Sequence, residues 1–165
     1  MNRGNPSRTA PTDDVGKDIK DHIDSLKSLS AYSIRDLVQH AEKFGLALRQ
    51  QRLETNQIRK FLDAINQIKA KAVDERAKAL ANKNESSLTA ENLQKIETEI
   101  FNKIETEIVL LKPKLAYAAT RQNAVEPLQR VISAAIDRTH NQDDFNRLVQ
   151  LIESIIAYHK AAGGK

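Results

Sequence analysis

Apolar side chains recur at every third or fourth position along most of this chain, with polar side chains between them. Because an α-helix turns by about 100° per residue, this spacing places the apolar side chains on one helical face. Six segments show the pattern, and it predicts helices at about residues 17–28, 34–49, 55–80, 90–121, 123–136 and 143–162. Residue types that favour strands are scarce, so the predicted fold class is all-α.

The predicted helices form a single domain. A chain of 165 residues that is 40% apolar is long enough for one core, and residues 17–163 are expected to make a compact bundle of five or six helices. Residues 1–16 contain Gly4, Pro6 and Pro11 without apolar periodicity, so we expect a flexible N-terminal arm there. Residues 143–162 are apolar around nearly half of the helix, which predicts a central or an interfacial position.

Short polar residues mark where several helices begin. Ser33, Thr55 and Thr89 each precede an apolar-periodic segment, and all three can accept a hydrogen bond from the first helical turn. Pro113 lies inside the 90–121 segment, where it removes a backbone hydrogen bond and clashes with the preceding turn. The sequence therefore predicts a kink or a break near Leu111.

A stripe of cations and an aromatic ring follows that proline. Lys114, Tyr117 and Arg121 are spaced i, i+3 and i+7, which sets them beside the apolar face of Leu111 and Leu115. Cations bind phosphates and a flat ring stacks on bases, so this spacing suits single-stranded nucleic acid, although a solvated helix edge has the same pattern. Because apolar residues flank Tyr117, we expect its ring to be partly buried with its hydroxyl exposed.

The charges are segregated along the chain. Residues 49–83 and 112–138 are rich in Lys and Arg, whereas residues 84–110 between them are acidic. Such segregation favours a polyanionic partner for the basic faces. Arg49 and Arg52 stand next to Arg59 and Lys60 in the first basic block, and Arg130 lies in the second.

The sequence offers little for catalysis or cofactor binding. It has no cysteine and no nucleotide-binding or nucleophile motif, and its four histidines lie in four separate segments. His159, near the end of the last helix, is expected to cap that helix rather than to act in catalysis. We therefore expect no enzyme activity, no catalytic residue, no metal and no cofactor. Without an apolar run long enough for a membrane span or a signal peptide, the expected location is cytoplasmic.

Three short stretches resemble a known family. Lys112-Pro113-Lys114-Leu115-Ala116-Tyr117-Ala118-Ala119 with Arg121 resembles a motif of the small subunit of the type III-A CRISPR-Cas effector, the Csm complex. Gln57-Ile58-Arg59-Lys60-Phe61 and the closing Ile156-Ala157-Tyr158-His159-Lys160 are similar to further parts of that family. The resemblance runs from about Ser33 to Lys160, with a gap at about 70–95.

This resemblance implies a non-catalytic, RNA-binding structural subunit. In that family several copies stack in a filament beside the backbone and large subunits, and they hold target RNA paired to the CRISPR RNA. Position by position, the resemblance implies RNA-binding roles for Arg59, Lys60, Lys112, Lys114, Tyr117 and Arg121. Charge and spacing add Arg49, Arg52 and Arg130 to the candidates.

Two other functions are compatible with a basic helical bundle. The first alternative is a protein-only scaffold or adaptor, whose basic faces would bind an acidic protein partner instead of RNA. The second is a four-helix metalloenzyme, for which the chain lacks the Glu-x-x-His spacing of di-iron bundles. RNA binding by the isolated protein distinguishes the RNA-binding subunit from the scaffold.

Overall fold

The computed structural model describes residues 11–163. Most of this part of the chain is helical, and it contains no β-strand. The α-helices are α1 (Pro11–Ser25), α2 (Ile34–Gln50), α3 (Thr55–Ala81), α4 (Ala90–Val109), α5 (Leu111–Arg121), α6 (Glu126–Asp137) and α7 (Gln142–Ala161). Three 3-10 turns connect them: η1 (Leu29–Ala31), η2 (Glu85–Ser87) and η3 (Asn123–Val125). With α4 and α5 counted as one broken helix, the described part has six helices, which confirms the all-α prediction.

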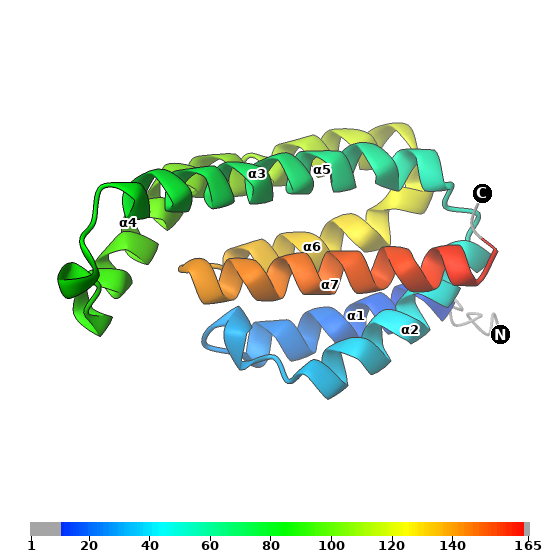
Figure 1. Cartoon of the computed structure of the whole chain (residues 1–165). Helices are drawn as coiled ribbons and strands as arrows, with labels where there is room; N and C mark the ends of the chain where they lie inside the picture. Colours follow the sequence, from blue (N-terminus) through cyan, green and yellow to red (C-terminus); the bar gives the residue numbers. More distant parts are fainter. Residues whose placement is uncertain (1–10, 164–165) are drawn as a thin grey trace, which may run out of the picture.

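The helices pack in three layers of two (Figure 1). Helices α6 and α7 form the middle layer, α1 and α2 cover one side of it, and α3 covers the other side with α4 and α5. The end of α3 and the start of α4 extend beyond the other two layers (Figure 1). None of the described helices is long and apolar enough to span a membrane.

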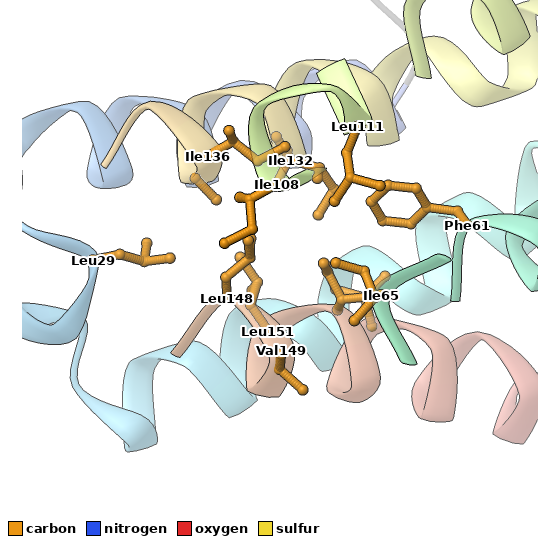
Figure 2. Close-up of a cluster of buried hydrophobic side chains, with 14 of the residues drawn as sticks. Leu29, Phe61, Ile65, Ile108, Leu111, Ile132, Ile136, Leu148, Val149 and Leu151 are labelled. Carbon is orange, nitrogen blue, oxygen red and sulfur yellow. The ribbon is translucent and has the colours of Figure 1, made fainter. Parts of the chain in front are cut away.

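Helix α7 lies at the centre of the core. Its wide apolar face allowed either a central or an interfacial position, and the structure shows the central one. Its apolar side chains are buried on both sides, against α2 in one layer and against α3 and α4 in another. Figure 2 shows part of this core, in which Leu148 and Leu151 of α7 belong to one hydrophobic cluster with Ile65 of α3, Ile108 of α4 and Ile132 of α6. Burying apolar side chains in this way is the main stabilising contribution to a fold of this kind.

The predicted helix starts are mostly confirmed. The Ser33 hydroxyl accepts a hydrogen bond from the Asp36 N–H at 3.1 Å, and the Thr89 hydroxyl accepts one from the Asn92 N–H at 3.3 Å. Thr55 does not cap α3, because Glu54 takes that position and shares a reciprocal capping box with Gln57.

The sequence predicted a kink or a break near Leu111, and the structure has a break between two helices. Helix α4 ends at Val109, a single residue follows, and α5 starts at Leu111 with Pro113 in its first turn. A proline is tolerated there because the N–H that it lacks would have no partner in a first turn. Leu110 between the two helices keeps right-handed helical backbone angles, with φ of −67° and ψ of −10°, so α5 continues from α4 instead of reversing.

The expected flexible arm over residues 1–16 is contradicted at residues 11–16, which are helical. Residues 1–10 lie outside the described residues, but residues 11–16 form the first turns of α1. The Thr12 hydroxyl is buried and donates a hydrogen bond to the Ala47 carbonyl at 3.0 Å, which fastens α1 to α2. Sequence periodicity missed this turn because a threonine provides the anchoring contact, not an apolar residue.

Gly45 permits the close approach of α2 and α7. A Cβ atom at this position would lie 2.7 Å from the His159 backbone nitrogen, 2.8 Å from the Tyr158 Cβ and 2.9 Å from the Ile155 carbonyl oxygen. Two of these atoms are backbone atoms that cannot rotate away. The glycine that lowers helix propensity is therefore required by the packing of the two helices.

We predict that Gly45→Ala destabilises the protein. The added methyl group should cost about 1 to 3 kcal/mol through overpacking, more than the ~1 kcal/mol that alanine gains in helix propensity. Gly16→Ala in α1 is the matched control, because its Cβ would meet only side chains, the nearest at 3.3 Å on the Phe44 ring. Thermal unfolding followed by circular dichroism should show a lower Tm for Gly45→Ala and little change for Gly16→Ala. An equal Tm for Gly45→Ala and the unmodified protein would contradict this packing.

A buried carboxylate joins the first helical layer to the start of α7. Asp144 is 0% exposed, and its oxygens accept hydrogen bonds from the Ser28 hydroxyl, from the Ser30 N–H at 2.8 Å and from the His140 N–H at 2.9 Å. Burial raises the pKa of Asp144, but these hydrogen bonds outweigh that effect, so its pKa lies below the ordinary 3.8.

We predict that Asp144 contributes acid-sensitive stability. Because its pKa is lower in the folded state, its contribution is complete above about pH 4 and is lost as the pH falls through the lowered pKa. Asp144→Asn should lower the free energy of unfolding by about 1 to 3 kcal/mol at neutral pH and flatten its decline in acid. Denaturant unfolding between neutral and acid pH measures both effects. The exposed neighbour gives the control, and Asp143→Asn should change stability by less than about 1 kcal/mol.

Candidate nucleic-acid interface

A pocket of about 520 Å³ lies between the first half of α3 and α5. Four of the nine predicted RNA-binding residues line it: Lys60 from α3 and Lys114, Tyr117 and Arg121 from α5. Arg59 is exposed beside Lys60 but does not line the pocket. The fold therefore brings two of the three sequence stretches of the family resemblance to one place.

The interior of this pocket is apolar. Its walls come from the loop before α3, from α3 and α5 themselves and from the chain that leads into α6. The apolar lining residues are Leu53, Ile58, Phe61, Ala64, Leu111, Leu115, Ala118, Val125 and Leu128. These residues belong to the hydrophobic core or pack against it, so the pocket is a place where the core opens to solvent.

Tyr117 is more exposed than expected. Its side chain is 62% exposed, so the expectation of a partly buried ring is wrong. The reason is geometric, because Tyr117 follows the buried Leu115 by two residues and hence lies about 200° away around the helix. The Arg121 guanidinium carbon lies 5.1 Å from the centre of the Tyr117 ring, within the range of a cation-π contact. The two side chains form one exposed surface at the edge of the pocket.

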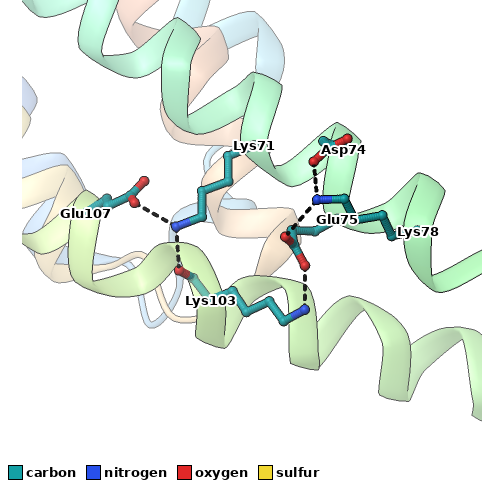
Figure 3. A network of polar contacts seen from close by, with 6 residues as sticks. All are labelled: Lys71, Asp74, Glu75, Lys78, Lys103 and Glu107. Atoms are coloured by element: carbon teal, nitrogen blue, oxygen red, sulfur yellow. Dashed lines mark hydrogen bonds and ion pairs between the residues drawn. The ribbon is translucent and has the colours of Figure 1, made fainter.

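At the far end of α3, by contrast, the cations are neutralised. Lys71 pairs with Glu107 at 2.7 Å, and Lys103 of α4 pairs with Glu75 (Figure 3). Lys78 contacts both Asp74 and Glu75, and Arg76 pairs with Glu97. These pairs are exposed or half-buried at the surface and contribute little to stability, but they cancel much of the charge of this part of the helix pair.

The cations at the pocket have no such partners. Among residues 11–163, no carboxylate lies within ion-pair distance of Arg59, Lys60, Lys114 or Arg121. The first basic block of the sequence is thus divided in space. Carboxylates of α4, of α7 and of α3 itself pair with cations of its second half, while its first half keeps its positive charge.

The loop that leads into α3 is held in place by backbone hydrogen bonds and by α7. The N–H groups of Arg52 and Leu53 bond to the carbonyls of Arg49 and Leu48, a Schellman motif that ends α2. Arg52 has a φ of 63° at the position usually taken by glycine, and its side chain is exposed. Arg49 donates from Nε to the Gly163 carbonyl at 2.7 Å.

His159 fastens the same loop and does not cap its own helix. It is buried, and its Nε2 lies 2.6 Å from the Leu53 carbonyl oxygen, which can only accept. Nε2 therefore carries the proton and donates. Burial lowers the pKa of His159 more than this bond raises it, so the ring is neutral near pH 7. A core residue thus sets the position of a wall of the pocket.

The amide side chains at the pocket were missed by the sequence reasoning. Asn56, Gln57 and Gln122 line it together with the cations. Asn56 precedes Lys60 by one helical turn, a spacing that could have identified it. Gln122 comes directly after α5, where periodicity gives no direction for a side chain.

Two predicted residues lie away from the pocket and have acidic partners. Lys112 pairs with Asp137 of α6, and Arg130 pairs with Glu126 at 2.9 Å and with Asp13 at 3.4 Å. The structure therefore does not bring these two cations to the pocket, and their RNA-binding roles stay predictions.

A family profile matches most of the chain. The family described as Csm2 Type III-A matches residues 31–165, a range that includes every residue that lines the pocket. The chain belongs to the Csm2 Type III-A family. It is therefore a small subunit of the type III-A CRISPR-Cas effector, the Csm complex, as the three short stretches suggested. No significant match was found among curated proteins or among solved structures.

The Csm2 Type III-A match does not cover α1, which carries one half of a histidine cluster. His22 of α1 and His40 of α2 have ring centres 5.2 Å apart, and the Tyr32 hydroxyl lies 2.6 Å from the His40 Nδ1. Burial and the neighbouring His22 lower the pKa of His40. No group of three potential metal ligands occurs in the described residues, so these histidines pack together without a third ligand.

Proposed function

We propose that this Csm2-family subunit binds RNA through the surface around the α3–α5 pocket and has no catalytic role. Within the Csm complex it would hold the target RNA paired to the CRISPR RNA, with several copies stacked beside the backbone and large subunits. The observation that carries the proposal is the convergence of unneutralised cations from two distant stretches on one exposed surface. The proposed location is the cytoplasm.

Phosphate is the ligand that this surface suits best. Lys60, Lys114 and Arg121 present three positive charges without carboxylate partners among residues 11–163, and a nucleic-acid backbone supplies regularly spaced negative charges. Such contacts carry no sequence information, so binding should be insensitive to base sequence. Base pairing between guide and target then supplies all the specificity, as in other RNA-guided systems.

An acidic protein partner is the second candidate. The same cations would attract clustered carboxylates, and both kinds of complex weaken with salt. The exposed Tyr117 ring favours RNA, because a flat exposed ring provides a stacking surface for bases or riboses. Binding of RNA by the isolated protein, and competition between RNA and the protein partner, distinguish the two.

We predict that Lys114→Ala with Arg121→Ala weakens RNA binding without destabilising the fold. Both side chains are exposed, so the Tm should stay nearly unchanged. The logarithmic slope of affinity against salt should fall by about one for each lost phosphate contact. Fluorescence anisotropy over a series of salt concentrations measures the slope.

The matched control for this pair is Lys71→Ala with Arg76→Ala, which removes the same two residue types from the neutralised end of α3. It should leave RNA affinity close to that of the unmodified protein. If both pairs reduced affinity equally, the binding would reflect total charge instead of the pocket surface. A lowered Tm with intact RNA binding would assign a structural role to Lys114 and Arg121.

We predict that Tyr117→Ala lowers RNA affinity at almost constant stability. The loss of a stacking ring should cost about 1 to 3 kcal/mol of binding free energy, whereas an exposed ring adds little to the fold. Tyr117→Phe keeps the ring and should bind almost as tightly as the unmodified protein. Parallel anisotropy and thermal unfolding experiments measure both quantities. Equal RNA affinity for the alanine and tyrosine forms would remove the ring from the interface.

A further inference from the structure

The interior of the α3–α5 pocket is not explained by phosphate contacts. Phosphates need charged or polar partners, and these stand at the edge of the pocket, on Lys60, Lys114 and Arg121. Behind them the walls are the apolar side chains of Phe61, Leu115 and their neighbours. An apolar cavity of about 520 Å³ that opens among phosphate-binding groups is of the size that small organic ligands occupy.

The lining residues restrict the chemistry of the ligand. None of them is acidic, so nothing in the pocket would compensate a positively charged ligand. A purely aliphatic ligand would leave the three cations and the amides of Asn56 and Gln122 without partners. The lining fits a ligand that joins a flat apolar group with hydrogen-bonding edges to a negatively charged chain.

We propose that the pocket takes up an unpaired nucleobase of the bound RNA, while Lys60, Lys114 and Arg121 hold the phosphates on either side of it. This inference rests on the proposed RNA-binding function and adds a subsite to it. The base would lie against the apolar walls, and its polar edges would face the amide side chains of Asn56 and Gln122. The charge complementarity favours this occupant over an apolar side chain of a partner protein.

The subsite should accept any base. Apolar walls and aromatic rings contact the faces of a base, which all four bases share, and amide side chains can both donate and accept hydrogen bonds. The pocket would therefore distinguish paired from unpaired nucleotides without reading sequence. A fully paired duplex keeps its bases stacked inside and could use the cations but not the interior.

Filling the pocket without changing its charge tests the proposal. Ala118→Leu enlarges a side chain of α5 that lines the pocket, and Ala64→Leu does the same from α3. The matched controls are Ala116→Leu and Ala70→Leu, which make the same substitution at exposed positions of the same two helices outside the pocket. Two independent pairs keep the test valid if one filling variant fails to fold, which circular dichroism would reveal.

Each protein is titrated with a short single-stranded RNA and with an RNA of the same length that lacks its bases. The unmodified protein should bind the RNA with bases at least about five-fold more tightly, the effect of stacking one base. The filling variants should bind the RNA with bases at least about five-fold more weakly than the unmodified protein does, with unchanged affinity for the abasic RNA, and should keep only the preference that stacking on Tyr117 provides. The exposed-position controls should keep the preference.

The remaining outcomes separate this inference from the function on which it rests. Equal binding of both RNAs by the unmodified protein would overturn the base subsite and leave the RNA-binding function intact. Binding of neither RNA would overturn both. If the filling variants bound RNA normally but no longer joined the purified remainder of the Csm complex, the pocket would be a protein-binding site and the base subsite would be wrong.

Discussion

The break between α4 and α5 is the constraint on which the candidate interface depends. Up to Val109 the chain pairs with α3 through buried isoleucines and ion pairs across the two helices. After the break, α5 packs mainly against α6, while α3 continues along α7. The two helices therefore separate at this end, and the space between them is the pocket. Pro113 makes an unbroken helix unfavourable at this point, so the opening follows directly from the sequence.

The surface that α3 shares with α4 and α5 is nearly neutral at one end and positively charged at the other. Between the second half of α3 and α4, lysines and arginines pair with glutamates on the facing helix, and the charges cancel locally. Near the pocket, α5 offers Lys114 and Arg121 to a basic part of α3, so like charges face one another. Like charges on one surface are unfavourable for the isolated protein, and a bound polyanion would relieve their repulsion. This arrangement is typical of a binding surface and would serve no purpose in packing.

Local patterns in the sequence were sufficient for the helices and insufficient for the contacts between them. The apolar period, the Ser33 and Thr89 caps and the Pro113 break each depend on neighbouring residues, and the structure confirms them. The exposure of Tyr117 was also accessible, because its angle from Leu115 follows from helix geometry alone. The sequence reasoning gave more weight to the apolar neighbours of this ring than to that angle.

The contacts that sequence reasoning missed join residues far apart in the chain. Lys112 is neutralised by Asp137 of another helix, and His159 bonds to Leu53 more than a hundred positions earlier. No periodicity within one helix carries information about such partners. The need for a glycine at position 45 is of the same kind, because it arises only when α7 crosses α2. Counting charges along the sequence therefore identified the basic blocks, but it could not tell which of their cations lack an acidic partner.

Stability and binding are separable in this architecture. The fold is held by the buried faces of α7 and its neighbours, by the Gly45 crossing and by the Asp144 carboxylate. Of these, only buried residues of α3, α5 and α6 reach the pocket, where they form its inner wall. The cations and Tyr117 stand on the outside of α3 and α5, and the fold does not need their charges. The link between the two parts is the loop at Leu53, whose carbonyl is held by the buried His159 while its side chain forms a wall of the pocket. A change in the core at this point should therefore alter the shape of the pocket before it alters the charges around it.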